Sequence, residues 1–257
     1  MIIKNDSEYK ILCECGKRLG AILKELAENV KPGITTGFLD ELANDLIHKA
    51  GGDAVFRGYR AYGSRGEYPA TLCTSVNSEI VHGIPRNSRL LKEGDVIGLD
   101  IGMRYPSETG LITDTALTIP VGKVSALAAK LIRGTNEALD EGIRAARVGG
   151  TVGDIGHAVE TRLKKYKLSI IRELVGHGVG RKLHEDPYIP NFGTEGKGIL
   201  LKDGMVVALE PMASLGSEDI ILDDDGWTYK TADGSLAAHF EHTIAIFNGG
   251  VEILTKR

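Results

Sequence analysis

Residues 92–100 read Lys-Glu-Gly-Asp-Val-Ile-Gly-Leu-Asp, and residues 202–210 read Lys-Asp-Gly-Met-Val-Val-Ala-Leu-Glu. In each stretch a glycine turn leads into an apolar run that ends on a carboxylate, which predicts a buried strand with an acid at its end. Such an acid is costly to bury unless it is paired or holds a metal ion. The matching positions of Asp100 and Glu210 therefore favour one shared site between two related halves of the chain.

Two other pairs of segments point to the same duplication. Residues 31–47 resemble residues 147–163, because each opens an amphipathic helix with the pattern Gly-x-Thr-x-Gly. That helix pair alone is as easily explained by chance recurrence. The segment that contains His82 matches the one that contains His177, with one residue inserted. We expect a single domain, residues 1–257, with halves of roughly 1–120 and 121–257.

Hydrophobic periodicity predicts four helices and four longer strands. The helices are expected at about 7–30, 36–50, 124–148 and 152–167. The strands are expected at 96–101, 111–119, 205–209 and 238–247, each bounded by Gly, Asp or Pro. Helices on an antiparallel-rich sheet make an α+β fold.

Composition restricts the class of protein. Charged residues make up 26% and hydrophobic residues 42%, as in ordinary soluble globular proteins, and the net charge of −4 argues against broad electrostatic binding to nucleic acid. Three cysteines are too few for a disulfide framework, and no run reaches the ~20 apolar residues of a membrane span. We therefore expect a cytoplasmic protein that contacts no membrane.

Two further acids and a histidine complete the candidate site. A turn around 105–107 would fold Asp100 and Asp114 together as a hairpin, and Glu241 begins another apolar strand. Glycines at 98 and 102 share the face of Asp100 and leave room beside its carboxylate. Taken singly, each acid is more often a solvated or ion-paired residue. Their joint pattern favours a site.

His177 lies between Gly176 and Gly178, which allow the close approach that an inward-pointing ligand needs. Four carboxylates and one imidazole without a thiolate suit a pair of Mn, Co or Fe ions better than a closed structural zinc. Two such ions, about 3.5–4 Å apart, would hold and deprotonate a bridging water, so hydrolysis is the natural reaction. A phosphate-binding loop is set aside, because no Lys-Ser or Lys-Thr pair follows these glycines.

With these motifs in order along nearly the whole chain, the sequence resembles the type I methionine aminopeptidases, within the pita-bread metallopeptidases. The matching stretches are 30–37, 73–85, 99–102, 113–115, 176–187, 209–212, 225–227 and 240–243. The resemblance implies the pita-bread fold, two pseudo-symmetric halves with a central sheet covered by helices. It also implies that two divalent ions (Co, Mn, Fe or Zn) are bound by Asp100, Asp114, His177, Glu210 and Glu241.

The resemblance assigns catalytic roles to His82, His184 and Glu210. It implies that His82 contacts the substrate near its N-terminus and that His184 donates a hydrogen bond to the reacting carbonyl. Without the family motif, His184 beside Glu185 and Asp186 would be interpreted as a surface histidine paired with acids.

A pocket for a methionine side chain is implied as well, since aromatic and sulfur contacts favour a thioether. Its expected residues are Phe56, Tyr59, Tyr62, Tyr68, Cys73 and Trp227. Core packing is at least as good an interpretation of Tyr62. Three features depart from the family: a longer spacing from Asp100 to Asp114, an expanded 56–68 stretch, and Leu183 where phenylalanine is common.

The implied reaction is release of the initiator methionine from new chains whose second residue is small. The expected partners are nascent polypeptide N-termini, with transient proximity to the ribosome, no specific nucleic acid, and a monomeric enzyme. An aminopeptidase acting on X-Pro bonds shares the five ligands but usually carries a large N-terminal domain. A catalytically dead pita-bread module is a rival of another class, although such modules have lost metal ligands.

Overall fold

The computed structural model describes residues 1–60 and 66–257. Its helices are α1 (Asp6–Glu28), α2 (Thr36–Lys49), α3 (Ala126–Ala145) and α4 (Val152–Lys165). All four predicted helices are confirmed, with ends shifted by at most three residues. Side-chain caps fix where they begin: Thr35 accepts from the backbone N–H of Phe38, and Thr151 forms a capping box with Asp154.

Within the described ranges, no helix combines the length and the apolar character that crossing a bilayer requires.

One large antiparallel sheet runs through the molecule. Along it lie β1 (Asp53–Ala54), β4 (Val96–Tyr105), β5 (Leu111–Pro120), β14 (Glu241–Phe247), β9 (Met205–Leu209), β7 (Gly176–Gly178) and β8 (Glu185–Ile189), with β2 (Cys73–Val76) beside β4 and β15 (Gly250–Ile253) beside β14. Two small sheets join β13 (Ala237–His239), β10 (Met212–Ser214) and β6 (Ser169–Ile170), and β11 (Ile220–Leu222), β12 (Tyr229–Thr231) and β3 (Glu79–Val81). The α+β fold is confirmed.

The strand predicted at 238–247 is wrong in one respect, because it is divided at Phe240. His239 pairs with Met212 in a small sheet, whereas Glu241 pairs with Ala116 in the large one. The chain therefore changes sheets at Phe240. The sequence pattern does not reveal such a change, since both segments are largely buried strands.

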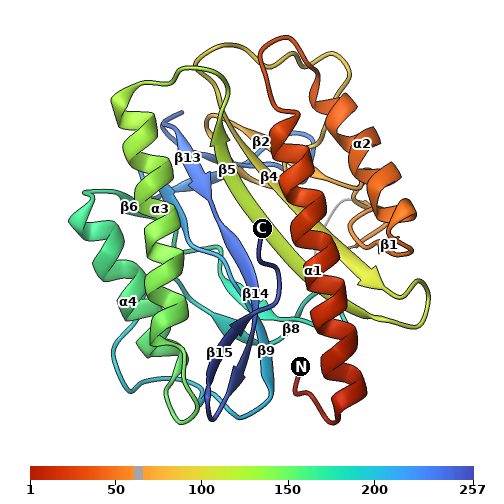
Figure 1. The fold of residues 1–257 in the computed structure, drawn as a ribbon. Coiled ribbons are helices and arrows are strands. Elements are labelled where there is room, and N and C mark those ends of the chain that lie inside the picture. The colour runs from red at the N-terminus through yellow and green to blue at the C-terminus, as the bar shows by residue number, and fades with distance from the viewer. Residues whose placement is uncertain (61–65) are drawn as a thin grey trace.

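The helices lie on one face of the large sheet, with α1 and α2 toward β4 and β5 and with α3 and α4 on the opposite side of the view (Figure 1). Leu19 and Leu23 of α1 pack with Ile97 and Leu99 of β4 in the main core, and all four are fully buried. Burying each such side chain stabilises the fold by about 1.5–3 kcal/mol. The core fixes the strands that carry the predicted ligands.

The C-terminal segment 254–257 lies against α1, and the C-terminus lies between α1 and α3 (Figure 1). Two glycines of α1 permit this approach, because a Cβ on Gly16 or Gly20 would lie less than 3.0 Å from the backbone of Leu254 or Lys256. Helix α1 therefore needs glycine, which has no side chain, where the C-terminal segment packs against it.

Arg257 bonds to both strands at the short junction between β5 and β14. Strands β5 and β14 pair at only two positions, Glu241 with Ala116 and His242 with Thr115. The guanidinium of Arg257 donates to the carbonyl oxygens of Ala116 and Glu241, at 2.5 and 2.7 Å, and to the hydroxyl of Thr115 at 3.2 Å. These bonds join the two strands on either side of the junction.

Substituting Gly20→Ala tests the packing of this segment. Alanine in a helix interior is intrinsically about 1 kcal/mol more favourable than glycine, but the added methyl would overlap the carbonyl of Lys256. We expect the clash to dominate and to lower the free energy of unfolding by roughly 1–3 kcal/mol in urea titrations. The matched control is Ala21→Ser, on the exposed side of the same turn, which should change stability little. A Gly20→Ala protein as stable as wild type would contradict this packing.

Candidate metal centre

The β4–β5 hairpin brings the two predicted aspartates together. The ladder runs from Val96 opposite Pro120 to Tyr105 opposite Leu111, and it sets Asp114 opposite Gly102 and Asp100 opposite Ala116. The aspartates are diagonal neighbours on one face of the hairpin. The prediction of a turn near 105–107 is confirmed, and the longer spacing is accommodated at the far end of the hairpin, away from both carboxylates.

A side chain larger than that of glycine would not fit at position 102. A Cβ at this position would lie 3.4 Å from Asp114 Oδ1 and less than 3.0 Å from Val55 and Phe56. The room that the sequence pattern predicted beside the carboxylates therefore exists, although Phe56 fills part of it.

The other predicted ligands come from strands on the far side of the junction. His177 on β7 pairs with Ala208 of β9, Glu210 follows the end of β9, and Glu241 begins β14. Asp100, Ala116 and Glu241 lie in one row across three strands. The small side chain of Ala116 separates the two acids of that row.

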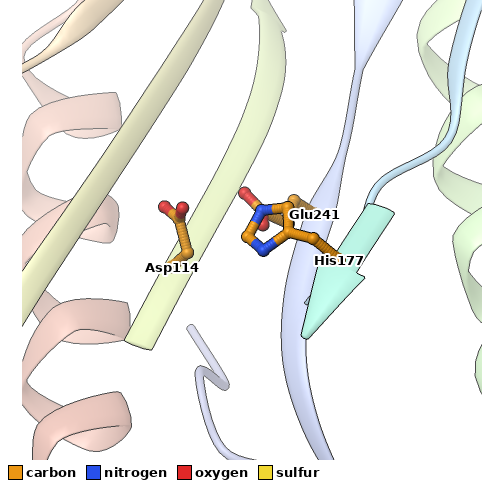
Figure 2. Close-up of side chains that lie close together, drawn as sticks. All are labelled: Asp114, His177 and Glu241. Atoms are coloured by element: carbon orange, nitrogen blue, oxygen red, sulfur yellow. The ribbon is translucent and has the colours of Figure 1, made fainter. Parts of the chain in front are cut away.

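The side chains of Asp114, His177 and Glu241 converge, and one ligand atom from each lies within 4.8 Å of the others. Figure 2 shows the two carboxylates and the imidazole extending from three different strands into a common space. All three residues are buried. Glu210 adjoins this group, with its Oε1 atom 3.5 Å from His177 Nε2.

All five predicted ligands line one cavity of about 300 Å³. Asp100 and Glu210 are thus brought to the same cavity as the three converging residues. The predicted substrate-contact residues Phe56, Tyr59, Tyr68, Cys73, His82, His184 and Trp227 line this cavity too. Tyr62 lies outside the described residues.

Burial raises the pKa of all four carboxyl groups. Burial is the largest cause at Asp100, Glu210 and Glu241, and the charges of neighbouring acids add to it, so that all three pKa values lie well above their usual range. Burial also raises the pKa of Asp114 to about 7. One positively charged lysine or arginine side chain cannot neutralise four carboxylates.

The chemistry of the site fits divalent metal ions. Asp100 Oδ1 and Glu241 Oε1 are buried and accept no hydrogen bond from any described residue. Unsatisfied carboxylate oxygens in this position cost several kcal/mol unless a cation compensates them. Burial lowers the pKa of His177 to about 3, which keeps its imidazole neutral and able to ligate.

His184 is held by a partner that the sequence did not identify. Its Nδ1 atom lies 2.6 Å from the hydroxyl oxygen of Tyr59, and its ring meets that of His177 edge to face at 4.4 Å. Tyr59 was expected to line a methionine pocket, but its hydroxyl contacts His184 as well. Sequence spacing gives no signal for this contact, because the two residues are 125 positions apart.

The backbone of His82 is unusual, since a φ of +59° places it in the left-handed region. Non-glycine residues in this region are uncommon and concentrate at functional sites. The centroid of its ring lies 6.4 Å from that of Trp227 and 6.0 Å from that of Tyr229. Burial lowers the pKa of His82 to about 4, so its imidazole is neutral at pH 7.

Aromatic rings form one wall of the cavity. Tyr68 meets Trp227 edge to face at 5.3 Å and Phe56 at 6.4 Å, and its hydroxyl donates to the carbonyls of Leu72 and Gly83. Tyr68 therefore offers its ring to the cavity, with its hydroxyl already bonded. The sequence missed other lining residues, Val81, Leu174, Val175, Tyr188 and Met212. Apolar residues at strand ends give no local signal that separates a cavity wall from core.

Comparisons with known proteins agree with this geometry. The model of metallopeptidase family M24 matches residues 10–248. A methionine aminopeptidase from Clostridium acetobutylicum is 42% identical over 255 residues, covering 99% of this chain and 98% of that protein. The crystal structure of a methionine aminopeptidase from Thermotoga maritima matches with a TM-score of 0.94 and 41% identity, covering all of both chains.

A more distant structure shares the fold alone. The Xaa-Pro dipeptidase from Bacillus anthracis has a TM-score of 0.76 and 21% identity, and this chain covers 62% of it. Family model, full-length relatives and structure all agree with the buried group of acids and histidine. The chain belongs to metallopeptidase family M24 and, within it, to the methionine aminopeptidases.

Proposed function

We propose that the chain removes the initiator methionine from nascent proteins and peptides whose second residue is small. The observation that carries this proposal is one cavity with ligand-type side chains at its floor and aromatic and sulfur side chains along its wall. The relatives named methionine aminopeptidase support the same activity. The proposed partners are nascent N-termini, met near the ribosome by a monomeric enzyme in the cytoplasm.

The proposed cofactor is a pair of divalent ions, Co, Mn, Fe or Zn, held by Asp100, Asp114, His177, Glu210 and Glu241. Carboxylate-rich sets with one imidazole suit such ions. When bound, the ions supply activation of a water molecule and polarisation of the scissile carbonyl. The oxygen atoms of Asp100 and Glu241 that lack protein partners support this ligand set.

His184 is proposed to donate a hydrogen bond to the carbonyl oxygen of the scissile bond. A neutral imidazole carries one N–H, and a Tyr59 hydroxyl that donates to Nδ1 leaves the proton on Nε2. The surrounding protein lowers the pKa of His184 to about 4, so the ring is neutral at pH 7. His184 would then stabilise negative charge that develops on the carbonyl oxygen.

His82 is proposed to contact the substrate near its N-terminus. It lines the same cavity as His184, and its ring lies 6.4 Å from that of Trp227. Glu210 is proposed to act in catalysis as well as in binding metal. A carboxylate at the cavity floor can take a proton during bond cleavage.

The methionine side chain is proposed to lie against Phe56, Tyr59, Tyr68, Cys73 and Trp227. Burial, followed by the charge of Asp100, raises the pKa of Cys73 well above its usual value, so its sulfur stays a neutral thiol. Contacts of a thioether with aromatic edges contribute about 0.3–1.5 kcal/mol each. Leu183 also lines the cavity, at a position where family members commonly carry phenylalanine.

We also propose that the single catalytic domain, residues 1–257, consists of two related halves, roughly 1–120 and 121–257. The matching segments 92–100 and 202–210 support this proposal, because each contributes an apolar strand of the large sheet, with Asp100 within β4 and Glu210 just after β9.

Specificity is tested with purified, metal-reconstituted protein. We expect turnover of Met-Ala-Ser to exceed that of Leu-Ala-Ser by at least tenfold, and Ala-Pro peptides to be cleaved far more slowly, because the aromatic wall recognises the first side chain. Release of the first residue is measured by liquid chromatography. A preference for leucine, or for proline in the second position, would assign the chain a different specificity.

The two histidines of the 177–184 segment should respond differently to substitution. His177→Ala removes an imidazole ligand and should lower both metal content and turnover. His184→Ala should retain its metal but lose roughly 10²–10³ in turnover, the usual effect of deleting one proton donor or oxyanion stabiliser. Elemental analysis is compared with turnover of a Met-Ala peptide for both variants. Loss of metal from His184→Ala, or near-normal turnover, would refute the role of His184.

A further inference from the structure

His239 stands directly behind Glu210 and has no part in the site described so far. Residues 237–239 form β13, which pairs with β10, and this register sets His239 opposite Met212, two residues beyond Glu210. The pairing of β13 with β10 therefore places the imidazole of His239 near the carboxylate of Glu210, which lies just before β10.

The backbone of His239 is fixed on both sides. Thr118 of β5 accepts a hydrogen bond from the His239 N–H at 2.9 Å and donates one to its carbonyl oxygen at 2.9 Å. The side chain is buried, with 3% of the residue exposed. The imidazole ring of His239 thus has few alternative positions, and the strand pairing determines which residues it contacts.

The Nε2 atom of His239 is buried and forms no hydrogen bond with any described residue. It lies 3.4 Å from Glu210 Oε2, while Glu210 Oε1 lies 3.5 Å from His177 Nε2. Glu210 is therefore bracketed by two imidazoles, one on each oxygen. A buried nitrogen left unsatisfied is unfavourable, and a shift of a few tenths of an ångström would give it a hydrogen bond to a carboxylate.

The two imidazoles approach Glu210 from different sides. His177 lines the cavity and converges with Asp114 and Glu241, whereas His239 is absent from the cavity wall in the described part of the chain. His239 reaches the carboxylate from within the protein. Its position suits a hydrogen-bond donor to a ligand, since donors of this kind orient carboxylates toward the metal and raise the affinity for it.

We propose that His239 is a positioning residue for Glu210, whose Oε2 atom accepts a hydrogen bond from His239 Nε2 so that Oε1 faces His177 and the cavity. This inference rests on the proposed metal centre. It assigns the proton of the neutral His239 ring to Nε2 and makes no use of a change in its charge.

Two amide substitutions separate the hydrogen bond from packing. The side-chain nitrogen of His239→Gln can reach the place of Nε2, whereas that of His239→Asn is about one bond too short. We expect His239→Asn to bind Mn(II) or Co(II) roughly 10–100-fold more weakly by isothermal titration calorimetry, and His239→Gln to stay within about threefold of wild type. The visible spectrum of the Co(II) protein should change in His239→Asn and be restored in His239→Gln.

Folding is monitored by thermal unfolding of the chelated proteins, in which the two variants should agree with each other. A further measurement needs no substitution. In ¹⁵N spectra of histidine-labelled wild-type protein, His239 should show a protonated Nε2 both without metal and after loading with diamagnetic Zn(II).

Two results would overturn the proposal. One is equal metal affinity for wild type and both variants, and the other is a large Zn-induced shift of the His239 Nε2 signal, which would make His239 a ligand. A wild-type protein that binds no metal would instead contradict the proposed function, so the two failures are distinguishable.

Discussion

Four carboxyl groups facing one small cavity form the constraint on which the rest of the structure depends. Asp100, Asp114, Glu210 and Glu241 repel one another when charged, and burial penalises the charge of each. The described residues place no lysine in contact with the group. The guanidinium of Arg257 bonds to two backbone oxygens and the Thr115 hydroxyl, and its charge offsets only part of the rise in the pKa of Glu241. Compensation by divalent cations is the arrangement that this geometry supports, and the neutral imidazole of His177 adds a ligand without adding charge.

The fold keeps these acids in place through backbone pairing and hydroxyl bonds at the junction of the sheet. Thr243 on β14 accepts from the Asp114 N–H at 2.9 Å and donates to the Asp114 carbonyl at 2.7 Å. Thr115 donates to the carbonyl of Glu241 at 2.9 Å, beside the bonds from Arg257. The strands carrying Asp114 and Glu241 pair over only two residues, so these bonds supply much of their alignment. Rigid placement of ligands is what a reactive metal site requires.

Local patterns were sufficient to predict the helices and the β4–β5 hairpin. The acid expected at the end of the strand 96–101 was misplaced in one respect, because β4 continues to Tyr105 and Asp100 lies within it. The glycine before each apolar run and the alternation around Asp100 are local signals, and the family resemblance added the roles of the histidines. The sequence could not show the contact of Tyr59 with His184 or the approach of His239 to Glu210, because these pairs depend on tertiary packing of distant segments. It also missed the division of residues 238–247 at Phe240, since both parts are largely buried strands. Roles of individual site residues stay predictions.

The most direct test of the central claim is to titrate chelator-treated protein with Mn(II) or Co(II) while following heat and turnover of Met-Ala-Ser in parallel. The account predicts up to two ions bound per chain and turnover that rises from near zero as the sites fill, because the carboxylate cluster is built to hold cations. Full turnover in protein shown by elemental analysis to be free of metal would contradict it.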